Sequence, residues 1–447
     1  MTVESLQKSL PADAVLVDFL EYRHSRPDPN RRGKWIFERR FLGFVVRPKQ
    51  ALHMVELGPA EDIEAKIEGW RNDLRRGLEQ EAGKVLRRML WEPLEKEVQG
   101  AKLVLIGADG ALGRLPLGAL PGKKAGSYLL EEVAIVAASV PQVLVDLLDP
   151  ERDVFKQRTP PSLLLIGDVD YDAKPSKSGA PTTAALAPQA DSGGQRIHWN
   201  RLGGTTKEID TLEKLFRKNF GSKGLVTLRD ADATEEAFRS QSGKQRWLHL
   251  ATHGFFAPSQ VKSALALSTQ NGRLEDADFF GRTGLVGFHP ALLSGVVLAG
   301  ANQTPQPGQD DGILTALEVG DLDLRKTELV VLSACETGLG QVAGGEGLLG
   351  LLRAFQVAGA RTVIASLWSV PDEPTRVLME RFYTNLWDKK MSKLDALIEA
   401  QRWMLREGRS HLGVARGLKL DERPGLSDQG RLRPYCWAAF VLSGDWR

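Results

Sequence analysis

The sequence predicts an α/β protein with a mostly parallel central sheet. Short apolar runs recur along the chain, and each ends in Gly, Asp or another turn residue. They lack polar alternation, which is typical of strands buried on both faces. Helical patterns separate several of them, so helices are expected to cover the sheet. The runs lie at residues 103–107, 163–168, 225–228, 247–252, 295–298, 329–334 and 362–367.

Length and composition are those of a globular protein with more than one domain. The chain has 447 residues, of which 42% are hydrophobic and 26% charged. Domains usually hold about 100–200 residues, so two or three are expected. Asp149-Pro150 and Pro160-Pro161 interrupt the pattern. We therefore predict a first part at 1–155 and a second part at 156–447.

The first part begins with a predicted strand pair followed by helix. Residues 14–20 and 41–46 are apolar and rich in β-prone types. The polar residues 25–34 between them favour a loop. Residues 60–98 are rich in Glu, Lys, Arg and Leu at helical spacing, which predicts one or two amphipathic helices.

The second part alternates strands with helices, apart from one irregular stretch. Helical patterns occupy 206–219, 232–241, 346–358 and 374–389. Residues 170–197 are rich in Ala, Pro, Ser, Gly and Lys and show little periodicity. A loop of this length is either a solvated insertion or a cleavable regulatory segment.

Charge and cysteine content limit the function classes. The formal net charge is +2, whereas a dedicated nucleic-acid binder carries a concentrated basic surface. Only two cysteines occur, which fits a reducing compartment. We find no signal peptide and no apolar run of about 18 residues. We therefore expect a cytoplasmic protein that acts on neither nucleic acid nor membrane.

His253 is the first candidate for catalysis. It follows the apolar run 247–252 and precedes Gly254, which lets a substrate approach the backbone closely. In open α/β sheets, ligands gather beyond the carboxyl ends of the strands. His249 lies inside the same run and is expected to be a core residue.

Cys335 occupies an equivalent position in another strand. It ends the run 329–334, and glycines and a predicted helix follow it. A thiol beside an imidazole becomes a thiolate nucleophile near neutral pH, and a helix N-terminus adds to this effect. Cys436 lies in an apolar context and is expected to be a buried structural cysteine.

The two residues together predict a Cys/His dyad. If their strands are neighbours, the imidazole and thiol face each other across one crevice. The backbone N–H groups of Gly254 and Cys335 are then candidates for an oxyanion hole, worth about 3–4 kcal/mol per donor. Thr252, Ser333 and Glu336 flank the dyad and are interpreted as packing residues.

Other chemistries lack their motifs. The sequence contains no phosphate-binding P-loop, no G-x-S-x-G and no C-x-x-C. A zinc site built from His249, His253 and Cys335 is conceivable, but the two histidines lie far apart along an extended strand. We therefore expect no metal and no cofactor.

Several blocks resemble the CHAT-domain proteases, whose clan includes caspases and separase. The histidine block 249–256 and the cysteine block 330–338 carry the resemblance, which extends over residues 100–447. The remaining matching blocks lie in the family's order at 103–120, 312–318, 360–372 and 434–445.

The resemblance implies a caspase-like α/β/α sandwich and hydrolysis of peptide bonds by Cys335 and His253. It makes residues 1–155 an inactive caspase-like half and 156–447 the catalytic region. Members commonly carry a helical-repeat array or sensor and act in bacterial defence or regulated proteolysis. This sequence has no such array, so we expect an activating partner outside it, besides a protein substrate.

Two alternatives to a protease stay open. One is a catalytically silent scaffold of the same fold. The other is a sensor that binds a nucleotide in the strand-end crevice. The presence of both catalytic residue types counts against the scaffold, and the lack of a nucleotide-binding motif counts against the sensor.

The substrate pocket is less defined than the dyad. Asp310, Asp311 and Asp372 lie in predicted loops beside the strands that carry the dyad. An acidic pocket would select Arg or Lys before the cleaved bond through charge-assisted hydrogen bonds. The alternative is that Asp311 and Asp372 cap loops, and that Trp368 forms a pocket wall.

Overall fold

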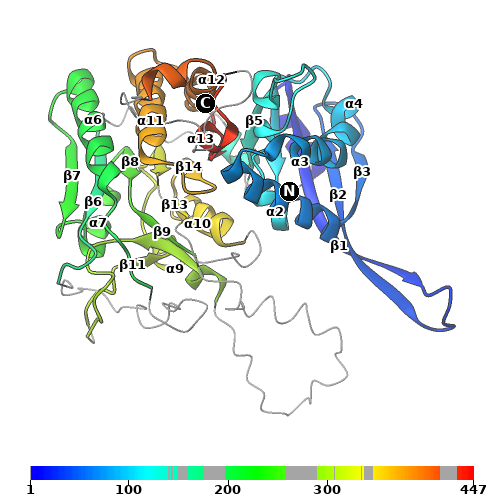
Figure 1. The fold of residues 1–447 in the computed structure, drawn as a ribbon, viewed down its shortest axis with the longest axis horizontal. Helices are drawn as coiled ribbons and strands as arrows, with labels where there is room; N and C mark the ends of the chain where they lie inside the picture. Colours follow the sequence, from blue (N-terminus) through cyan, green and yellow to red (C-terminus); the bar gives the residue numbers. More distant parts are fainter. Residues whose placement is uncertain are drawn as a thin grey trace, which may run out of the picture. The chain divides into compact units, whose positions relative to one another are not determined.

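The chain folds into two compact units in the computed structural model (Figure 1). One unit contains residues 1–157 and 370–447, and the other contains 158–369. The chain thus passes from the first unit to the second after residue 157, close to the expected boundary at 155. It returns to the first unit between Ser369 and Val370. The structure describes residues 2–138, 141, 144–149, 160–174, 197–256, 289–306, 308–333, 335–336, 346–412 and 430–447.

The first unit contains a mixed sheet with the strand order β3-β2-β1-β4-β5-β15. β1 pairs in parallel with β4, β4 with β5, and β5 with β15, whereas β2 pairs antiparallel with β1 and β3. The predicted strand pair is confirmed. The strands are β1 (Ala14–Pro27), β2 (Trp35–Val46), β3 (His53–Pro59), β4 (Leu103–Gly107), β5 (Ala134–Ala137) and β15 (Phe440–Gly444).

Helices of the first unit follow apolar stripes. Ile63, Ile67, Trp70 and Leu74 recur every three or four residues of α2 and are buried. The predicted helices of 60–98 are confirmed. The helices are α1 (Val3–Ser9), α2 (Ala60–Arg76), α3 (Glu79–Leu86), α4 (Glu95–Val98), α5 (Leu144–Leu148), α11 (Asp372–Trp387), α12 (Lys393–His411) and α13 (Pro434–Trp437), with a π turn at Arg87–Trp91.

The second unit contains the strands that the apolar runs predict. Its larger sheet has the order β14-β12-β8-β6-β7, and every pair in it is parallel. The predicted α/β class with a mostly parallel sheet is therefore confirmed. These strands are β6 (Leu163–Val169), β7 (Leu225–Asp230), β8 (Trp247–Leu250), β12 (Leu329–Leu332) and β14 (Thr362–Ser366).

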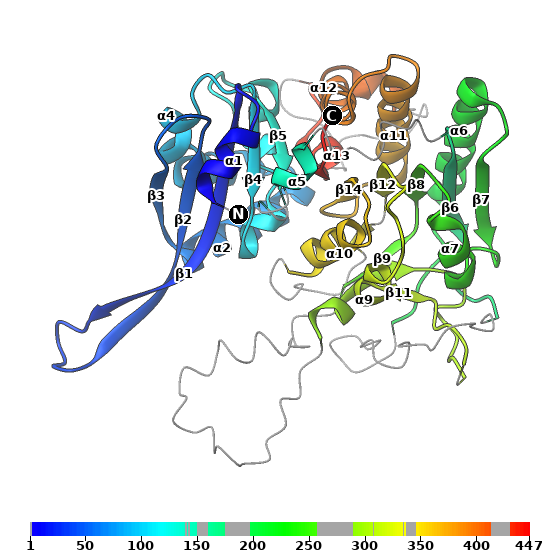
Figure 2. The same ribbon diagram turned by 180° about the vertical axis from the view of Figure 1, so that it is seen from behind.

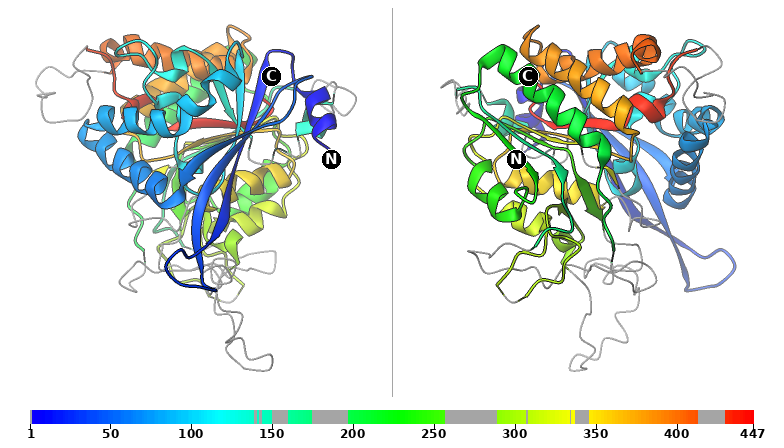
Figure 3. Two further views of the ribbon diagram at one scale, coloured as in Figure 1. Left: turned by 90° about the vertical axis from the view of Figure 1, so that its right-hand side faces the viewer. Right: turned by 60° about the vertical axis from the view of Figure 1, so that its left-hand side comes forward.

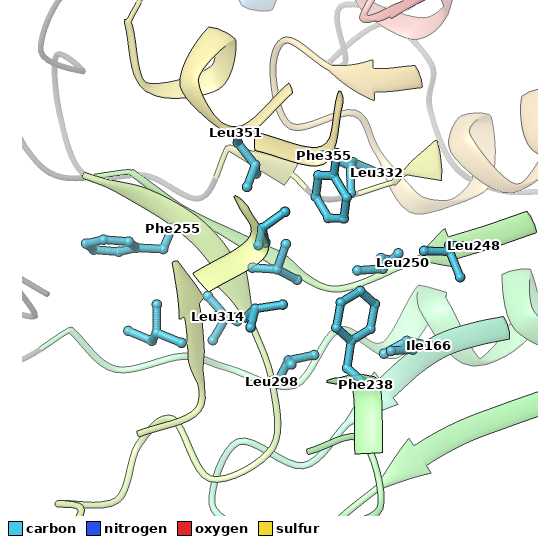
Figure 4. Close-up of a cluster of buried hydrophobic side chains, with 14 of the residues drawn as sticks. Ile166, Phe238, Leu248, Leu250, Phe255, Leu298, Leu314, Leu332, Leu351 and Phe355 are labelled. Atoms are coloured by element: carbon cyan, nitrogen blue, oxygen red, sulfur yellow. The ribbon is translucent and has the colours of Figure 1, made fainter. Parts of the chain in front are cut away.

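Helices cover both faces of this parallel sheet (Figure 2). On one face, Phe216 of α6 contacts Trp247 of β8, with ring centroids 6.3 Å apart. On the other, Phe238 of α7 and Phe355 of α10 join the apolar core (Figure 4). Alternate side chains of a strand point to opposite faces of the sheet, and here helices pack on both faces. Positions on both faces of such a strand are therefore mostly apolar, which explains the continuous apolar runs. The helices are α6 (Gly203–Phe220), α7 (Glu235–Ser242), α9 (Ala316–Gly320) and α10 (Glu346–Val357).

A second, smaller sheet corrects one expectation. We expected His253 at the end of the strand 247–252, but β8 stops at Leu250 and His253 opens a new strand. The smaller sheet has the order β11-β10-β9-β13. Its strands are β9 (His253–Phe256), β10 (Ser294–Val297), β11 (Ile313–Thr315) and β13 (Cys335–Glu336).

Among the helices in the described ranges, none has the length and apolar content that crossing a bilayer requires.

Removal of the Phe238 ring should destabilise the second unit. Phe238 is fully buried against the apolar core, so Phe238→Ala should lower the free energy of unfolding by about 3–5 kcal/mol. Val357 is 77% exposed, so the control Val357→Ala should change it by less than about 0.5 kcal/mol. Urea denaturation followed by circular dichroism measures both. Equal effects of the two substitutions would contradict this packing.

Candidate active site

The structure brings the backbones of His253 and Cys335 together. β9 pairs in parallel with β13, and in this pairing Cys335 is in register with His253 and Glu336 with Gly254. The preceding strands β8 and β12 are also parallel neighbours. Adjacent strands lie about 4.8 Å apart, so the two predicted dyad residues occupy neighbouring backbone positions.

The imidazole of His253 is held in one tautomer. Its Nε2 lies 2.7 Å from the backbone oxygen of Asn200. A carbonyl oxygen can only accept, so Nε2 carries the proton and donates it to Asn200. Nδ1 then bears the lone pair. In the described part of the chain this buried atom has no hydrogen-bond partner.

Two aromatic rings enclose the imidazole. The rings of Tyr171 and Trp199 lie 5.1 and 5.3 Å from that of His253, measured between centroids. Burial lowers the pKa of His253 below its ordinary 6.5, and the hydrogen bond to Asn200 offsets part of this effect. Both effects considered, the lowered pKa favours the neutral imidazole, which is the form that a general base requires.

Thr252 anchors the backbone immediately before His253. Its hydroxyl donates to the carbonyl of Val297 at 2.5 Å. The same Oγ1 lies 2.8 Å from the hydroxyl of Tyr171, which must then be the donor. Thr252 is fully buried, as expected of a packing residue, and it also fixes one of the rings beside the imidazole.

A second buried network links the strands that lead to the dyad. Glu208 of α6 lies with Oε1 3.0 Å from Nε2 of His249, and it accepts a hydrogen bond of 2.8 Å from Ser333. His249 belongs to β8, and Ser333 immediately follows β12. His249 is fully buried, as expected of a core histidine. One carboxylate therefore connects the ends of the two strands.

These positions do not favour a zinc site. His249 faces Glu208 from the larger sheet, whereas His253 belongs to the smaller sheet. Among the residues that the structure describes, no three His, Cys, Asp or Glu side chains form a metal-binding group.

Asp310 and Asp311 lie inside the second unit. Asp310 accepts a hydrogen bond of 3.0 Å from Arg239, and Asp311 accepts one of 2.9 Å from the N–H of Ile313. Glu235 is buried beside them, and its pKa is raised well above the ordinary value, chiefly by burial and then by the charge of Asp311. Both aspartates are thus engaged within the fold. These contacts give no support to a role in substrate selection, which stays a prediction.

Trp368 and Asp372 belong to different units. Trp368 is buried in the second unit, where its carbonyl accepts a hydrogen bond of 2.6 Å from Ser366. Asp372 is exposed and begins α11 of the first unit. Their roles in substrate binding also stay predictions.

The second cysteine is a buried residue, as expected. Cys436 lies in α13, and burial raises the pKa of its thiol to about 11. A thiol with such a pKa is almost fully protonated at neutral pH and is therefore unreactive.

Four residues of the two networks and their surroundings were not predicted from the sequence. Tyr171 lies in the segment 170–197, which was expected to be either a solvated insertion or a cleavable segment, yet it is buried, so the expectation of a solvated insertion is wrong at this position. The remainder of that segment, 175–196, lies outside the described residues. Trp199 and Asn200 follow it directly. Glu208 had a detectable signal, because it stands as a charge on the apolar stripe of α6.

The site and the fold together define an α/β protein that holds a histidine and a cysteine side by side, just beyond two parallel strands. The chain belongs to the CHAT family, because the model of the CHAT domain matches residues 80–445.

Curated relatives contain this region as a small part. The chain is 28% identical over 296 residues to tetratricopeptide repeat protein 28 of Mus musculus, covering 64% of this chain and 10% of that protein. Identity to the Homo sapiens protein of the same name is 25% over 366 residues, covering 80% of this chain and 12% of that protein. The match thus spans about a tenth of the length of these relatives.

Solved structures with similar folds are cysteine proteinases and their complexes. The Arg-specific cysteine proteinase gingipain R has a TM-score of 0.38 and 12% identity, covering 86% of this chain and 74% of that one. The Saccharomyces cerevisiae separase–securin complex has a TM-score of 0.46 and 10% identity, covering 99% of this chain and 30% of that one.

The titration of His253 should differ between the folded and unfolded chain. Because its folded-state pKa is lower, the unfolded chain binds more protons between that value and about 6.5. Stability should therefore fall as the pH decreases through this window, then level off. NMR titration of the imidazole should give a lower pKa than in urea. His253→Gln should remove this part of the pH dependence, and its persistence in that variant would contradict the assignment.

The buried carboxylate of Glu208 should stabilise the fold strongly. Glu208→Leu leaves the hydroxyl of Ser333 without this acceptor and His249 without its carboxylate, which should cost roughly 2–4 kcal/mol. The exposed Glu236→Leu in α7 serves as a control and should be close to neutral. Thermal unfolding compares the two variants. A loss no larger than that of the control would mean that the network contributes little.

Proposed function

We propose that this chain is a cysteine endopeptidase in which Cys335 is the nucleophile and His253 the general base. The observation that carries the proposal is the state of the His253 imidazole. Its Nε2 proton is committed to Asn200, and its buried Nδ1 has no partner in the described part of the chain. The backbone of Cys335 lies in register beside it.

The proposed reaction begins with proton transfer. The S–H proton of Cys335 moves to Nδ1 of His253, and the thiolate attacks the carbonyl carbon of the scissile peptide bond. The imidazolium then gives its proton to the leaving amine as the C–N bond breaks, which leaves a thioester. A water molecule gives a proton to Nδ1 and its oxygen attacks the thioester. The C–S bond then breaks, and the imidazolium returns its proton to the sulfur of Cys335, which leaves the carboxylic acid and the free thiol.

This reaction requires the thiol to lie on the same face of the small sheet as the imidazole. Residues in register on neighbouring strands ordinarily share a face, so the pairing of Cys335 with His253 supports this requirement. Burial of His253 supports the protonation of the leaving amine. A lowered pKa makes the imidazolium a stronger acid toward the leaving amine.

Asn200 acts in the proposal as a positioning residue. Nε2 keeps its proton throughout the cycle, so its hydrogen bond to the Asn200 carbonyl survives both protonation states of the ring. The bond strengthens when the ring is charged. It therefore orients Nδ1 toward the thiol and stabilises the imidazolium intermediate.

Gly254 and Cys335 are proposed to supply the oxyanion hole through their backbone N–H groups. Gly254 lies in β9 with Val296 in register on one side and Glu336 on the other. The oxyanion would form where the carbonyl of the substrate reaches these two N–H groups. Two directed N–H donors there would lower the barrier by several kcal/mol.

The biological setting of the proposal follows the relatives. Both curated relatives are named as tetratricopeptide repeat proteins, and the chain matches only about a tenth of them. We propose that a repeat or sensor region outside this sequence controls cleavage of a protein substrate, as in regulated proteolysis or bacterial defence. Residues 1–155 would then serve as the inactive caspase-like half.

Cleavage of a peptide library tests the reaction. Each peptide varies the residue before the scissile bond, and mass spectrometry detects the products. Wild type and the control Cys436→Ala should cleave the same peptides, whereas Cys335→Ala and His253→Ala should lose at least a thousandfold in rate. Preference for Arg or Lys would support the predicted acidic pocket of Asp310, Asp311 and Asp372. Cleavage by Cys335→Ala at the wild-type rate would overturn the proposal.

Thiol labelling separates a resting protease from a silent scaffold when no peptide is cleaved. At neutral pH, iodoacetamide should modify Cys335 much faster than Cys436, because burial raises the pKa of the Cys436 thiol to about 11. His253→Ala should slow the labelling of Cys335. Equal and slow labelling of both thiols in the native protein would favour the scaffold.

A further inference from the structure

Strands β1 and β2 extend beyond their sheet as a two-stranded ribbon, here called the β-ribbon (residues 21–40; Figures 1 and 3). β1 and β2 stay paired as far as Pro27 and Trp35. β4 accompanies β1 only to Asp18, and β3 accompanies β2 only from Arg40 onward. Within the described part of the chain, both long edges of the β-ribbon therefore lack a strand partner, except at Arg40, which pairs with Pro59.

One face of the β-ribbon carries exposed aromatic side chains. The register places Trp35 opposite Pro27 and Phe37 opposite Ser25, and opposite residues share a face. The exposed fractions of Trp35 and Phe37 are 57% and 54%. The guanidinium of Arg23 lies 3.9 Å from the centre of the Phe37 ring, which orients both groups.

The β-ribbon is also strongly basic. It holds seven Lys or Arg against three Asp or Glu, an excess of four charges, whereas the whole chain has a net charge of +2. Arg31, Arg32 and Lys34 at its tip are exposed, and none of them forms a salt bridge among the described residues. At its base, Arg23 lies directly opposite Arg39.

The directly opposite pair of Arg23 and Arg39 destabilises the pairing of the two strands in the β-ribbon by charge repulsion. The charge of Arg39 is balanced by Glu21 and Glu64, both 2.7 Å away. Among the described residues Arg23 forms no salt bridge, and it contacts the ring of Phe37. The apolar strip of Pro27, Trp35 and Phe37 thus lies between two basic ends.

Protection against aggregation explains only part of this pattern. Natural proteins guard open strand edges with charged residues and proline, and Pro27 with the basic residues fits that role. Two neighbouring aromatic rings that are more than half exposed have the opposite effect. Their retention on one face, beside unpaired cations, is typical of a binding surface.

We propose that the β-ribbon binds an extended acidic segment of another protein, with apolar residues at the centre and Asp or Glu at both ends. The segment adds as a strand along the open edge of β2, where main-chain hydrogen bonds fix it. Its apolar centre packs on Trp35 and Phe37, and its acidic ends meet Arg23 and the tip cations. A polypeptide can form main-chain hydrogen bonds with an open strand edge, whereas a nucleic acid cannot.

Fluorescence polarisation tests this proposal on the full chain carrying Cys335→Ala, so that cleavage cannot interfere. The probe is a labelled nonapeptide with three acidic residues on each side of Leu-Phe-Leu. It should bind, and the affinity should fall with salt. Trp35→Ala with Phe37→Ala, or Arg31→Glu with Arg32→Glu and Lys34→Glu, should weaken binding at least tenfold. Amide exchange at 35–39 should slow when the peptide is bound.

Matched controls are available in the same unit. Met54 is 60% exposed on β3, so Met54→Ala removes an apolar surface residue outside the β-ribbon and should leave binding unchanged. Lys8→Glu with Lys66→Glu and Arg88→Glu reverses three exposed charges elsewhere and should have less than a threefold effect. Absence of peptide binding, equal losses in the controls, or tighter binding of single-stranded oligouridylate would each overturn the proposal. None of these outcomes bears on the proposed proteolysis.

Discussion

The pairing of β9 with β13 is the constraint on which the site depends. Leu250 pairs with Leu332 in the larger sheet, and His253 pairs with Cys335 in the smaller one, so both pairs have a sequence separation of 82. The two segments leave the parallel sheet after the paired residues Leu250 and Leu332. Each segment then pairs again three residues later, at His253 and Cys335. The register fixed by the buried strands is thereby transmitted to the dyad.

Directional polar contacts hold this transition in place. Apolar packing is non-directional and fixes position better than orientation. Glu208 connects His249 of β8 to Ser333, which follows β12, before the chain changes sheets. Thr252 lies between β8 and β9, and its hydroxyl bonds to Val297 of the smaller sheet. Each of these side chains is buried, so an unpaired polar atom there would be expensive. The networks specify one arrangement of the strand ends.

The sequence predicted the strands well because burial on both faces leaves continuous apolar runs, as at 163–168 and 329–334. It predicted that the backbones of His253 and Cys335 lie close together, because both residues follow such runs. It did not predict that β8 stops at Leu250, since the change of sheet depends on pairing with β10, which is distant in sequence. The contact of Asp310 with Arg239 was also invisible, because an ion pair between distant segments leaves no local pattern.

The burial of Nδ1 in His253 favours catalysis over a purely structural role. A buried polar atom without a partner costs about 1–3 kcal/mol, and the described part of the chain offers it none. A silent scaffold would gain stability from a partner for this atom or from an apolar side chain. The fold instead fixes the opposite nitrogen on Asn200 and encloses the ring with Tyr171 and Trp199. Such an arrangement keeps a lone pair open to an incoming proton, and the residue in register beside it is a cysteine.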